Sequence, residues 1–283
     1  MKAIRNLIKV SRPRFWLYIF GPYIVGLAAG ADSRSDFIDW QIILFGFYFL
    51  FPANLLIYGV NDIADYETDK LNPKKQGYET LVAPDSRRSL SIWIAVFNIP
   101  FLVAAAVFYP SGLLILSGFV FLSLFYSLPP IRAKAVPFLD SAFNILYVFP
   151  GIFSYYMMSG SYPQFSALLA AGLWTAAMHA YSAVPDIEAD REARVPTIAT
   201  TLGPRVTLML CGLLYAASSI LAFQYLSYLS VILGAAYLIM IALSFRTADR
   251  ASVFSIYRYF PILNAVGGFL IFWYAFLSHI PLK

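Results

Sequence analysis

The residues most suited to chemistry in this chain are acidic, and they gather in two short stretches. The 283 residues include only 15 Asp and Glu. The first stretch reads Asn61-Asp62-Ile63-Ala64-Asp65-Tyr66-Glu67-Thr68-Asp69, and the second reads Asp186-Ile187-Glu188-Ala189-Asp190. Residues four apart in a helix share one face. If the helix before each stretch continues through it, each stretch directs several carboxylates to one side.

Carboxylates this close repel one another unless a cation lies between them. Hard oxygen ligands suit Mg²⁺, which usually binds through one or two carboxylates together with phosphate oxygens of a substrate. The candidate metal ligands are Asp62, Asp65, Asp69, Asp186 and Asp190. The alternative, that these are ordinary solvated loop acids, stays open for either stretch taken alone.

A site that holds a diphosphate also needs cations. The basic residues near the two stretches are Lys74, Lys75, Arg132, Lys134, Arg191 and Arg194. Each of them could instead be a charge that only sets membrane topology. Arg132 and Lys134 are the stronger candidates, because the Pro129-Pro130 turn restricts where they point.

The elements that position these residues are predicted to be membrane helices. The chain is 60% hydrophobic and 12% charged, about half the charge of a soluble domain. A spanning helix needs about 20 mostly apolar residues. Nine apolar blocks can be drawn: Phe15–Ala31, Trp40–Gly59, Leu90–Tyr109, Gly112–Leu128, Phe138–Met158, Phe165–Val184, Val206–Ala222, Leu226–Ser244 and Tyr259–Leu277. We therefore expect an all-α membrane protein of nine transmembrane helices, forming a single domain over residues 1–283.

The basic residues predict an orientation. With the N-terminus in the cytoplasm, all of the 20 Lys and Arg except Arg34 and Lys283 lie on the cytoplasmic side, as the positive-inside rule requires. This places both acidic stretches on that side, in the plasma membrane. Since the net charge of +5 is explained by topology, we expect no nucleic-acid partner. The basic segment Met1–Arg14 lacks the apolar core of a cleavable signal, so the first block is expected to be retained.

These motifs resemble a known family. Asn-Asp-x-x-Asp-x-x-x-Asp at 61–69, Tyr-Ser-x-Pro-Pro-x-Arg-x-Lys at 126–134 and Asp-x-x-x-Asp at 186–190 look like the UbiA superfamily of intramembrane prenyltransferases. Arg12-Pro13 is similar to the start of that family. The resemblance implies nine helices around a central cavity capped by the two acidic loops. It further implies that Mg²⁺ and the allylic diphosphate of an isoprenoid bind there.

The resemblance also implies roles for individual residues. Mg²⁺ and basic residues would neutralise the departing diphosphate, and aromatic faces would stabilise the allylic cation. The catalytic candidates are Asp65, Asp69, Asp186, Asp190, Tyr126 and Tyr181. The diphosphate-binding candidates are Asn61, Lys74, Arg132, Lys134 and Arg191.

The acceptor is indicated by the run Ser-Ala-x-Pro-Asp-Ile-x-x-Asp-Arg-Glu-Ala at 182–193. It looks most like the lycopene-elongase branch, which adds five-carbon units to carotenoid ends, although Arg194 stands where that branch usually has glycine. The donor implied is dimethylallyl diphosphate, and the acceptor is a hydrophobic polyene. No cation lies within the apolar blocks to bind an acidic acceptor. Prenylation of a quinone or aromatic precursor remains an alternative.

An alternative from another class is a cation-coupled transporter. Transporters tend to place ionisable residues near the middle of the bilayer, whereas the acids here gather at one face. Three polar residues within the blocks are left open at this stage. Asp140 and Asn144 either face the cavity or pair between helices, and His179 is either structural or functional.

Overall fold

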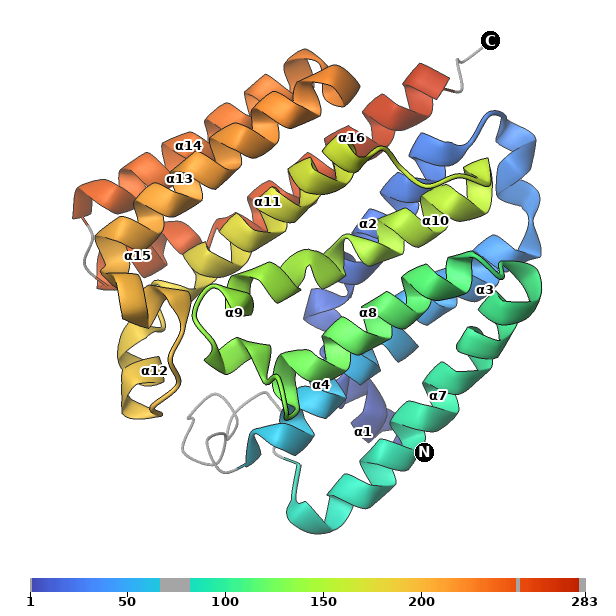
Figure 1. Ribbon diagram of the computed structural model, residues 1–283, viewed down its shortest axis with the longest axis horizontal. Coiled ribbons are helices and arrows are strands. Elements are labelled where there is room, and N and C mark those ends of the chain that lie inside the picture. The colour runs from blue at the N-terminus through green and yellow to red at the C-terminus, as the bar shows by residue number, and fades with distance from the viewer. Residues whose placement is uncertain (1, 67–81, 248–249, 280–283) are drawn as a thin grey trace. The chain divides into compact units, whose positions relative to one another are not determined.

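The regular elements of the described chain are all helices, as predicted. The computed structural model describes residues 2–66, 82–247 and 250–279 (Figure 1). The chain forms two compact units, and each is described by itself. Unit 1 comprises Met1–Arg132 and Phe149–Ser161, and unit 2 comprises Ala133–Val148 and Tyr162–Lys283.

Unit 1 holds the first acidic stretch. Its α-helices are α1 (Lys2–Val10), α2 (Trp16–Gly30), α3 (Trp40–Leu50), α4 (Pro52–Ala64), α7 (Arg87–Phe108), α8 (Gly112–Ser127) and α10 (Phe149–Ser159). Short 3₁₀ turns join them: η1 (Pro13–Phe15), η2 (Arg34–Ile38) and η3 (Pro84–Ser86).

Small residues let two helices of unit 1 approach closely. A Cβ at Gly26 of α2 would collide with the carbonyl oxygen of Gly151 in α10, and one at Gly30 would lie 2.7 Å from the carbonyl oxygen of Tyr155. Such close backbone approach is a usual means of helix association in membranes, where the hydrophobic effect does not drive helices together. Next to this contact lies a core of fully buried rings that includes Phe45, Phe49, Phe119 and Phe153.

The second predicted block is interrupted at Pro52, where α3 ends and α4 begins. Proline has no backbone N–H, so carbonyls of the preceding turn lose a donor. The side-chain amide of the fully buried Asn54 donates to the carbonyls of Phe49 and Leu50, at 3.0 Å each. A second buried amide, that of Asn98 in α7, donates to the carbonyl of Pro52 at 3.2 Å. These bonds hold α4 in place, and α4 carries the first acidic stretch.

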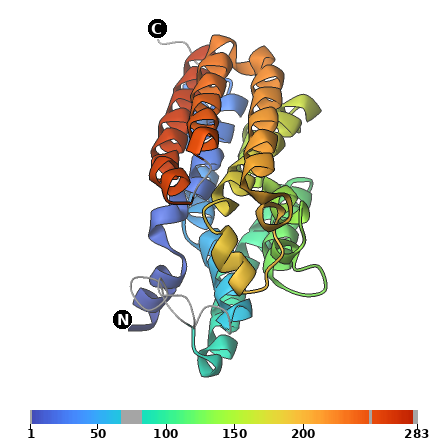
Figure 2. The same cartoon turned by 90° about the vertical axis from the view of Figure 1, so that its left-hand side faces the viewer.

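Unit 2 holds the second acidic stretch. Its helices are η4 (Ala133–Ala135), α9 (Leu139–Ala142), η5 (Phe143–Tyr147), α11 (Phe165–Ala183), α12 (Ile187–Glu192), α13 (Ile198–Leu226), α14 (Tyr228–Thr247), α15 (Arg250–Tyr257) and α16 (Phe260–His279). The long helices α11, α13, α14 and α16 run side by side (Figures 1 and 2). Hydroxyls tie α13 to its neighbours: Ser218 donates to the carbonyl of Ala170 in α11, and Ser219 donates to that of Ser230 in α14.

Five helical stretches of the described residues are long and apolar enough to cross a membrane: Trp40–Ala64, Pro84–Phe108, Ile198–Leu226, Tyr228–Arg246 and Val253–Ser278. The predicted count of nine spans is therefore not confirmed and stays a prediction. A stripe of exposed apolar side chains follows α7: Ile92, Val96, Ile99, Val103 and Val107. A patch of this kind is a liability in water but is expected against lipid.

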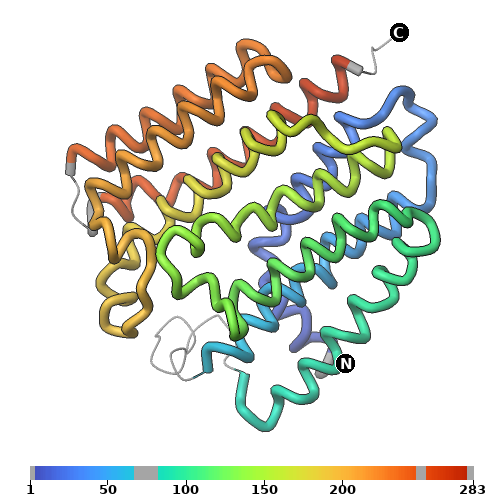
Figure 3. The backbone as a smooth tube through the Cα atoms, in the orientation of Figure 1, coloured from blue at the N-terminus to red at the C-terminus, as the bar shows by residue number. Residues whose placement is uncertain are grey.

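Two more predicted blocks differ from the observed helices. Phe138–Met158 is not one helix, because the chain forms α9, η5 and α10 in turn (Figure 3). The helix predicted from Val206 is preceded by a short helical turn that begins at Ile198, and the two are separated at Gly203, whose φ of +75° is not helical. Proline follows at position 204, so the separation lies where the helix would lose a backbone hydrogen bond.

Candidate active site in two acidic clusters

The first acidic cluster lies at the C-terminal end of α4. Asn61 and Asp62 belong to the helix, and Asp65 is its C-terminal cap, with its backbone N–H bonded to the carbonyl of Asn61 at 3.0 Å. The side-chain amide of Asn61 donates to Asp65 Oδ2 at 2.9 Å. The helical spacing expected from the sequence therefore holds from 61 to 65. Asp69, Lys74 and Lys75 lie outside the described residues.

Two arginines approach this cluster. Arg12 Nη2 lies 2.7 Å from Asp62 Oδ1, and the Asp62 side chain is only 2% exposed. Arg132 Nη2 lies 3.8 Å from Asp65 Oδ1, and the Arg132 side chain is 45% exposed. The first pair is buried and short, so Asp62 is tied to the N-terminal segment. The second is longer and solvent-accessible, which leaves the Arg132 guanidinium able to reach a further anion.

Residues of α8 border the first cluster. Asn61 also donates to the hydroxyl of Ser127, the last residue of α8, at 3.3 Å. Tyr126 precedes it and is half-buried. Ser127 was not selected from the sequence, although it stands next to Tyr126 in the 126–134 motif. The contact shows that this motif and the first acidic stretch meet within unit 1.

The second acidic cluster lies on α12. The expected continuation of the preceding helix is wrong here, because α11 ends at Ala183 and Asp186 is the N-terminal cap of the separate helix α12. The Asp190 N–H bonds to the carbonyl of Asp186 at 2.9 Å, so the two acids still share one turn. Asp186 is exposed and Asp190 is partly buried.

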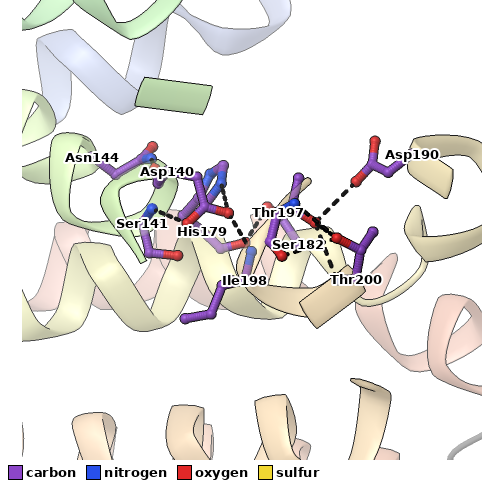
Figure 4. Close-up of polar contacts among 9 residues, drawn as sticks. All are labelled: Asp140, Ser141, Asn144, His179, Ser182, Asp190, Thr197, Ile198 and Thr200. Atoms are coloured by element: carbon purple, nitrogen blue, oxygen red, sulfur yellow. Dashed lines mark hydrogen bonds and ion pairs between the residues drawn. The ribbon is translucent and has the colours of Figure 1, made fainter. Parts of the chain in front are cut away.

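The charge state of Asp190 reflects these surroundings. Burial, followed by the neighbouring Asp186 carboxylate, raises the Asp190 pKa to about 6. A hydrogen bond from Thr197 Oγ1 to Asp190 Oδ2, at 3.4 Å, acts in the opposite direction (Figure 4). Thr197 was missed from the sequence. The sequence could have indicated it, because a threonine directly before an apolar helix commonly caps that helix.

The remaining candidates of unit 2 differ in exposure. Arg191 is exposed on α12 and Lys134 is partly buried in η4. Tyr181 is fully buried, and its hydroxyl lies 2.8 Å from that of Ser244. The rings of Tyr257 and Phe260 lie 5.4 and 5.5 Å from its own. This environment favours packing over contact with a substrate for Tyr181.

The polar residues within the fifth and sixth blocks meet in unit 2. Asp140 is fully buried and accepts the backbone N–H groups of Ser141 and Ile198, each at 2.8 Å. His179 Nε2 lies 3.8 Å from Asp140 Oδ2 (Figure 4). Asn144 bonds locally to the carbonyl of Asp140 at 2.7 Å. Of the two alternatives for Asp140, pairing between elements is the one observed.

The donor set of the two clusters fits Mg²⁺. Within the described ranges, no group of three or more His, Cys, Asp or Glu side chains is placed to hold a metal. Each cluster instead offers two carboxylates, which suits an ion that completes its shell with water and phosphate oxygens. Burial and the Asp186 carboxylate raise the pKa of Asp190, and a cation bound between the two acids would lower it.

Comparison with known proteins identifies the family. The model of the UbiA prenyltransferase family matches residues 19–266. This chain belongs to the UbiA prenyltransferase family. It is therefore an integral membrane enzyme that transfers prenyl groups, and the transporter alternative is set aside. The family predicted from the three motifs is confirmed.

Curated relatives of this UbiA prenyltransferase are lycopene elongase/hydratases. The protein of that name from Haloferax volcanii is 38% identical over 267 residues, covering 94% of this chain and 86% of the relative. The one from Haloarcula japonica is 42% identical over 206 residues, covering 72% of this chain and 69% of the relative. The predicted likeness to the lycopene-elongase branch is confirmed.

Solved structures share the fold of this UbiA prenyltransferase. A UbiA homologue from Archaeoglobus fulgidus bound to GPP and Mg²⁺ has a TM-score of 0.69 at 20% identity, covering 96% of this chain and 98% of that one. The same homologue bound to DMAPP and Mg²⁺ has a TM-score of 0.66 at 21% identity, covering 96% and 98%. The predicted UbiA-like fold is confirmed.

Proposed function

We propose that this prenyltransferase transfers a dimethylallyl group from dimethylallyl diphosphate to the ends of a carotenoid such as lycopene, with Mg²⁺ as its cofactor. The observation that carries the proposal is the likeness to the Haloferax lycopene elongase/hydratase over 94% of the chain. The binding of DMAPP and Mg²⁺ by the Archaeoglobus homologue supports the choice of donor and metal.

In this proposal both acidic clusters take part in binding Mg²⁺ and the diphosphate. The proposed metal ligands are Asp62, Asp65, Asp69, Asp186 and Asp190, of which all but Asp62 are also proposed to be catalytic. Bound Mg²⁺ would neutralise the charge that develops on the leaving diphosphate. Asp62 pairs with Arg12 at 2.7 Å, and Asp65 accepts a hydrogen bond from the Asn61 amide at 2.9 Å.

The basic and amide side chains are proposed to bind the diphosphate. They are Asn61, Lys74, Arg132, Lys134 and Arg191. Arg132 is supported best, since its guanidinium lies near Asp65 and is 45% exposed. Arginine presents a planar fork that matches phosphate oxygens. Tyr126 is the proposed aromatic contact for the allylic cation, and Tyr181 is the weaker candidate because its hydroxyl and both neighbouring rings are engaged in packing.

The proposal includes an orientation. We place the enzyme in the plasma membrane as a single domain, with its N-terminus in the cytoplasm and its active site opening to the cytoplasmic side. The distribution of Lys and Arg supports this. A water-soluble diphosphate made in the cytoplasm would then reach the acidic clusters directly, while a polyene would enter from the lipid.

Pigment analysis tests the acceptor. Expression in a lycopene-producing host is expected to yield carotenoids enlarged by one or two five-carbon units, detected by chromatography with mass spectrometry. The control is the same host with the Asp65→Ala variant. Unchanged pigment from a well-expressed protein would contradict a carotenoid acceptor and favour a quinone or aromatic precursor.

Alanine substitutions test the two clusters. We expect Asp65→Ala and Asp186→Ala each to lower turnover at least about 100-fold, because each removes a carboxylate from the metal site. Expression and helix content should be retained, as neither side chain is buried in the core. Asp39→Ala, at the exposed start of α3, is the matched control. Normal turnover in either cluster variant would refute a site built from both.

A further inference from the structure

The roles proposed above make no use of Asp140, although it has the least solvent contact of the carboxylates described in unit 2. Its side chain is fully buried. Burying a carboxylate is costly unless hydrogen-bond donors compensate it. Here the donors are two backbone N–H groups at 2.8 Å, with His179 at 3.8 Å. The bond to Ser141 is local, but the bond to Ile198 joins segments 58 residues apart.

Ile198 is the first residue of α13, so its N–H has no partner within the helix. Asp140 supplies that partner from α9. Thr197, the N-terminal cap, and Thr200 bond reciprocally, from Thr200 N to Thr197 Oγ1 at 3.2 Å and from Thr197 N to Thr200 Oγ1 at 2.8 Å. The first turn of α13 is thus fixed from two sides (Figure 4).

The same turn contacts the second acidic cluster. The Thr197 hydroxyl that accepts from Thr200 also donates to Asp190 Oδ2 at 3.4 Å. A continuous series of contacts therefore leads from Asp140 through the Ile198 N–H and the adjacent Thr197 to Asp190. If the Asp140 bond were lost, the capping turn would be free to shift, and the hydrogen bond from Thr197 to Asp190 would shift with it.

We propose that Asp140 is a positioning residue for the second acidic cluster: through the first turn of α13 and Thr197, it sets where the Asp190 carboxylate lies and so tunes the affinity for the metal–diphosphate pair. The inference rests on the proposed role of Asp190 as a metal ligand. Groups that orient metal ligands typically change metal affinity about 10- to 100-fold when removed.

The test measures binding rather than turnover. Purified protein in detergent is titrated with Mn²⁺ in the presence of inorganic pyrophosphate, and bound Mn²⁺ is followed by electron paramagnetic resonance. Asp140→Asn keeps the side-chain volume, but its amide cannot accept both N–H groups that the carboxylate accepts. We expect the Mn²⁺ affinity of this variant to fall about tenfold. The thermal unfolding midpoint without metal is recorded in parallel to show whether the variant folds.

Further variants separate positioning from capping. Thr197→Val removes the hydroxyl that contacts Asp190 and should weaken Mn²⁺ binding to a similar extent, whereas Thr197→Ser restores the hydroxyl and should bind as the wild type does. Asp39→Ala removes a side chain that caps α3 by accepting the Gln41 N–H at 2.9 Å. It is the control for loss of a helix cap alone, and its Mn²⁺ affinity should not change.

The outcomes separate this inference from the proposed function. If the wild type binds no Mn²⁺ with pyrophosphate, the proposed metal site is wrong, and the inference falls with it. If the wild type binds but Asp140→Asn folds and binds equally well, only the inference is overturned. If Asp140→Asn does not fold, the Thr197 variants decide. Wild-type Mn²⁺ affinity in Thr197→Val would overturn the inference. A tenfold loss of Mn²⁺ affinity in Thr197→Val, restored in Thr197→Ser, would support it.

Discussion

Arg194 occupies a turn whose backbone suits glycine. Its φ is +54°, in the left-handed region. The Val195 N–H bonds to the carbonyl of Asp190 at 2.8 Å and the Arg194 N–H to that of Arg191 at 3.1 Å, which is the Schellman pattern that ends many helices. The resemblance to the lycopene-elongase branch predicts glycine at this position. The structure gives the physical reason, since glycine adopts positive φ without steric cost.

We predict that Arg194→Gly stabilises the protein by about 0.5–1 kcal/mol, because it relieves a left-handed conformation that costs other residues about 1–2 kcal/mol. The readout is the thermal unfolding midpoint in detergent. Ala189→Gly, within α12, is the matched control and should destabilise by up to about 1 kcal/mol. Equal destabilisation by both glycines would show that the turn is not strained.

Asp190 gives a prediction for pH. A proton and a metal ion compete for the same carboxylate, and the Asp190 pKa lies at about 6. Above pH 6 the carboxylate is ionised and free to bind a cation. As the pH falls below 6 it is protonated, so apparent Mn²⁺ affinity should drop by up to about tenfold per pH unit. Titrations between pH 5 and 8 measure this, and unchanged affinity at pH 5 would contradict it.

At the scale of the helix, the contact between α2 and α10 depends on a missing side chain. We predict that Gly26→Ala destabilises unit 1 by about 1–3 kcal/mol, because the new methyl group would meet the Gly151 carbonyl and the Ser154 hydroxyl in a packed interior. The measurement is the fraction of monodisperse protein after heating in detergent.

Gly21 lies on the same helix and provides the control. A Cβ there has no neighbouring atom within 4 Å, so Gly21→Ala should be neutral or slightly stabilising through helix propensity. If both alanines behaved alike, the close approach of α2 and α10 would not limit stability.

The ends of some helices could be predicted from the extent of the apolar blocks, because the thickness of a bilayer sets the length of a spanning helix. The apolar block Gly112–Leu128 corresponds to α8 at Gly112–Ser127, and Phe165–Val184 corresponds to α11 at Phe165–Ala183. Composition does not reveal local hydrogen bonding, however. This is why the split at Pro52 and the early start of α13 at Ile198 were missed.

The acidic residues of the candidate site could be selected from the sequence, but their partners could not. The carboxylates at 61–65 and 186–190 could be selected because their spacing is local and helical. The partners Arg12 and Ile198 are 50 and 58 residues away from the acids they contact, and only folding brings them there. For the contact between Asp140 and Ile198, the one signal in the sequence was an aspartate within an apolar block, because a charge in such a block requires a partner.

At the scale of the whole molecule, the proposed orientation can be tested by labelling. In a Cys211→Ala background, the chain has no other cysteine. Ser35 in η2 and Ser86 in η3 are both exposed. With the N-terminus inside, Ser35→Cys should react with a membrane-impermeant maleimide in intact cells, and Ser86→Cys only after permeabilisation. The reverse pattern would invert the orientation, and labelling of both in intact cells would refute the helix count between them.

The pair between Arg12 and Asp62 links the start of the chain to the first acidic cluster. Arg12 also stacks its guanidinium over the ring of Tyr58, 4.8 Å away. A shortened protein that starts at Phe15 would keep every apolar block and would still insert into the bilayer. It would nevertheless lose a counter-charge of a carboxylate that is only 2% exposed, so trimming these few leading residues would damage the proposed metal-binding end of α4 without removing any membrane anchor.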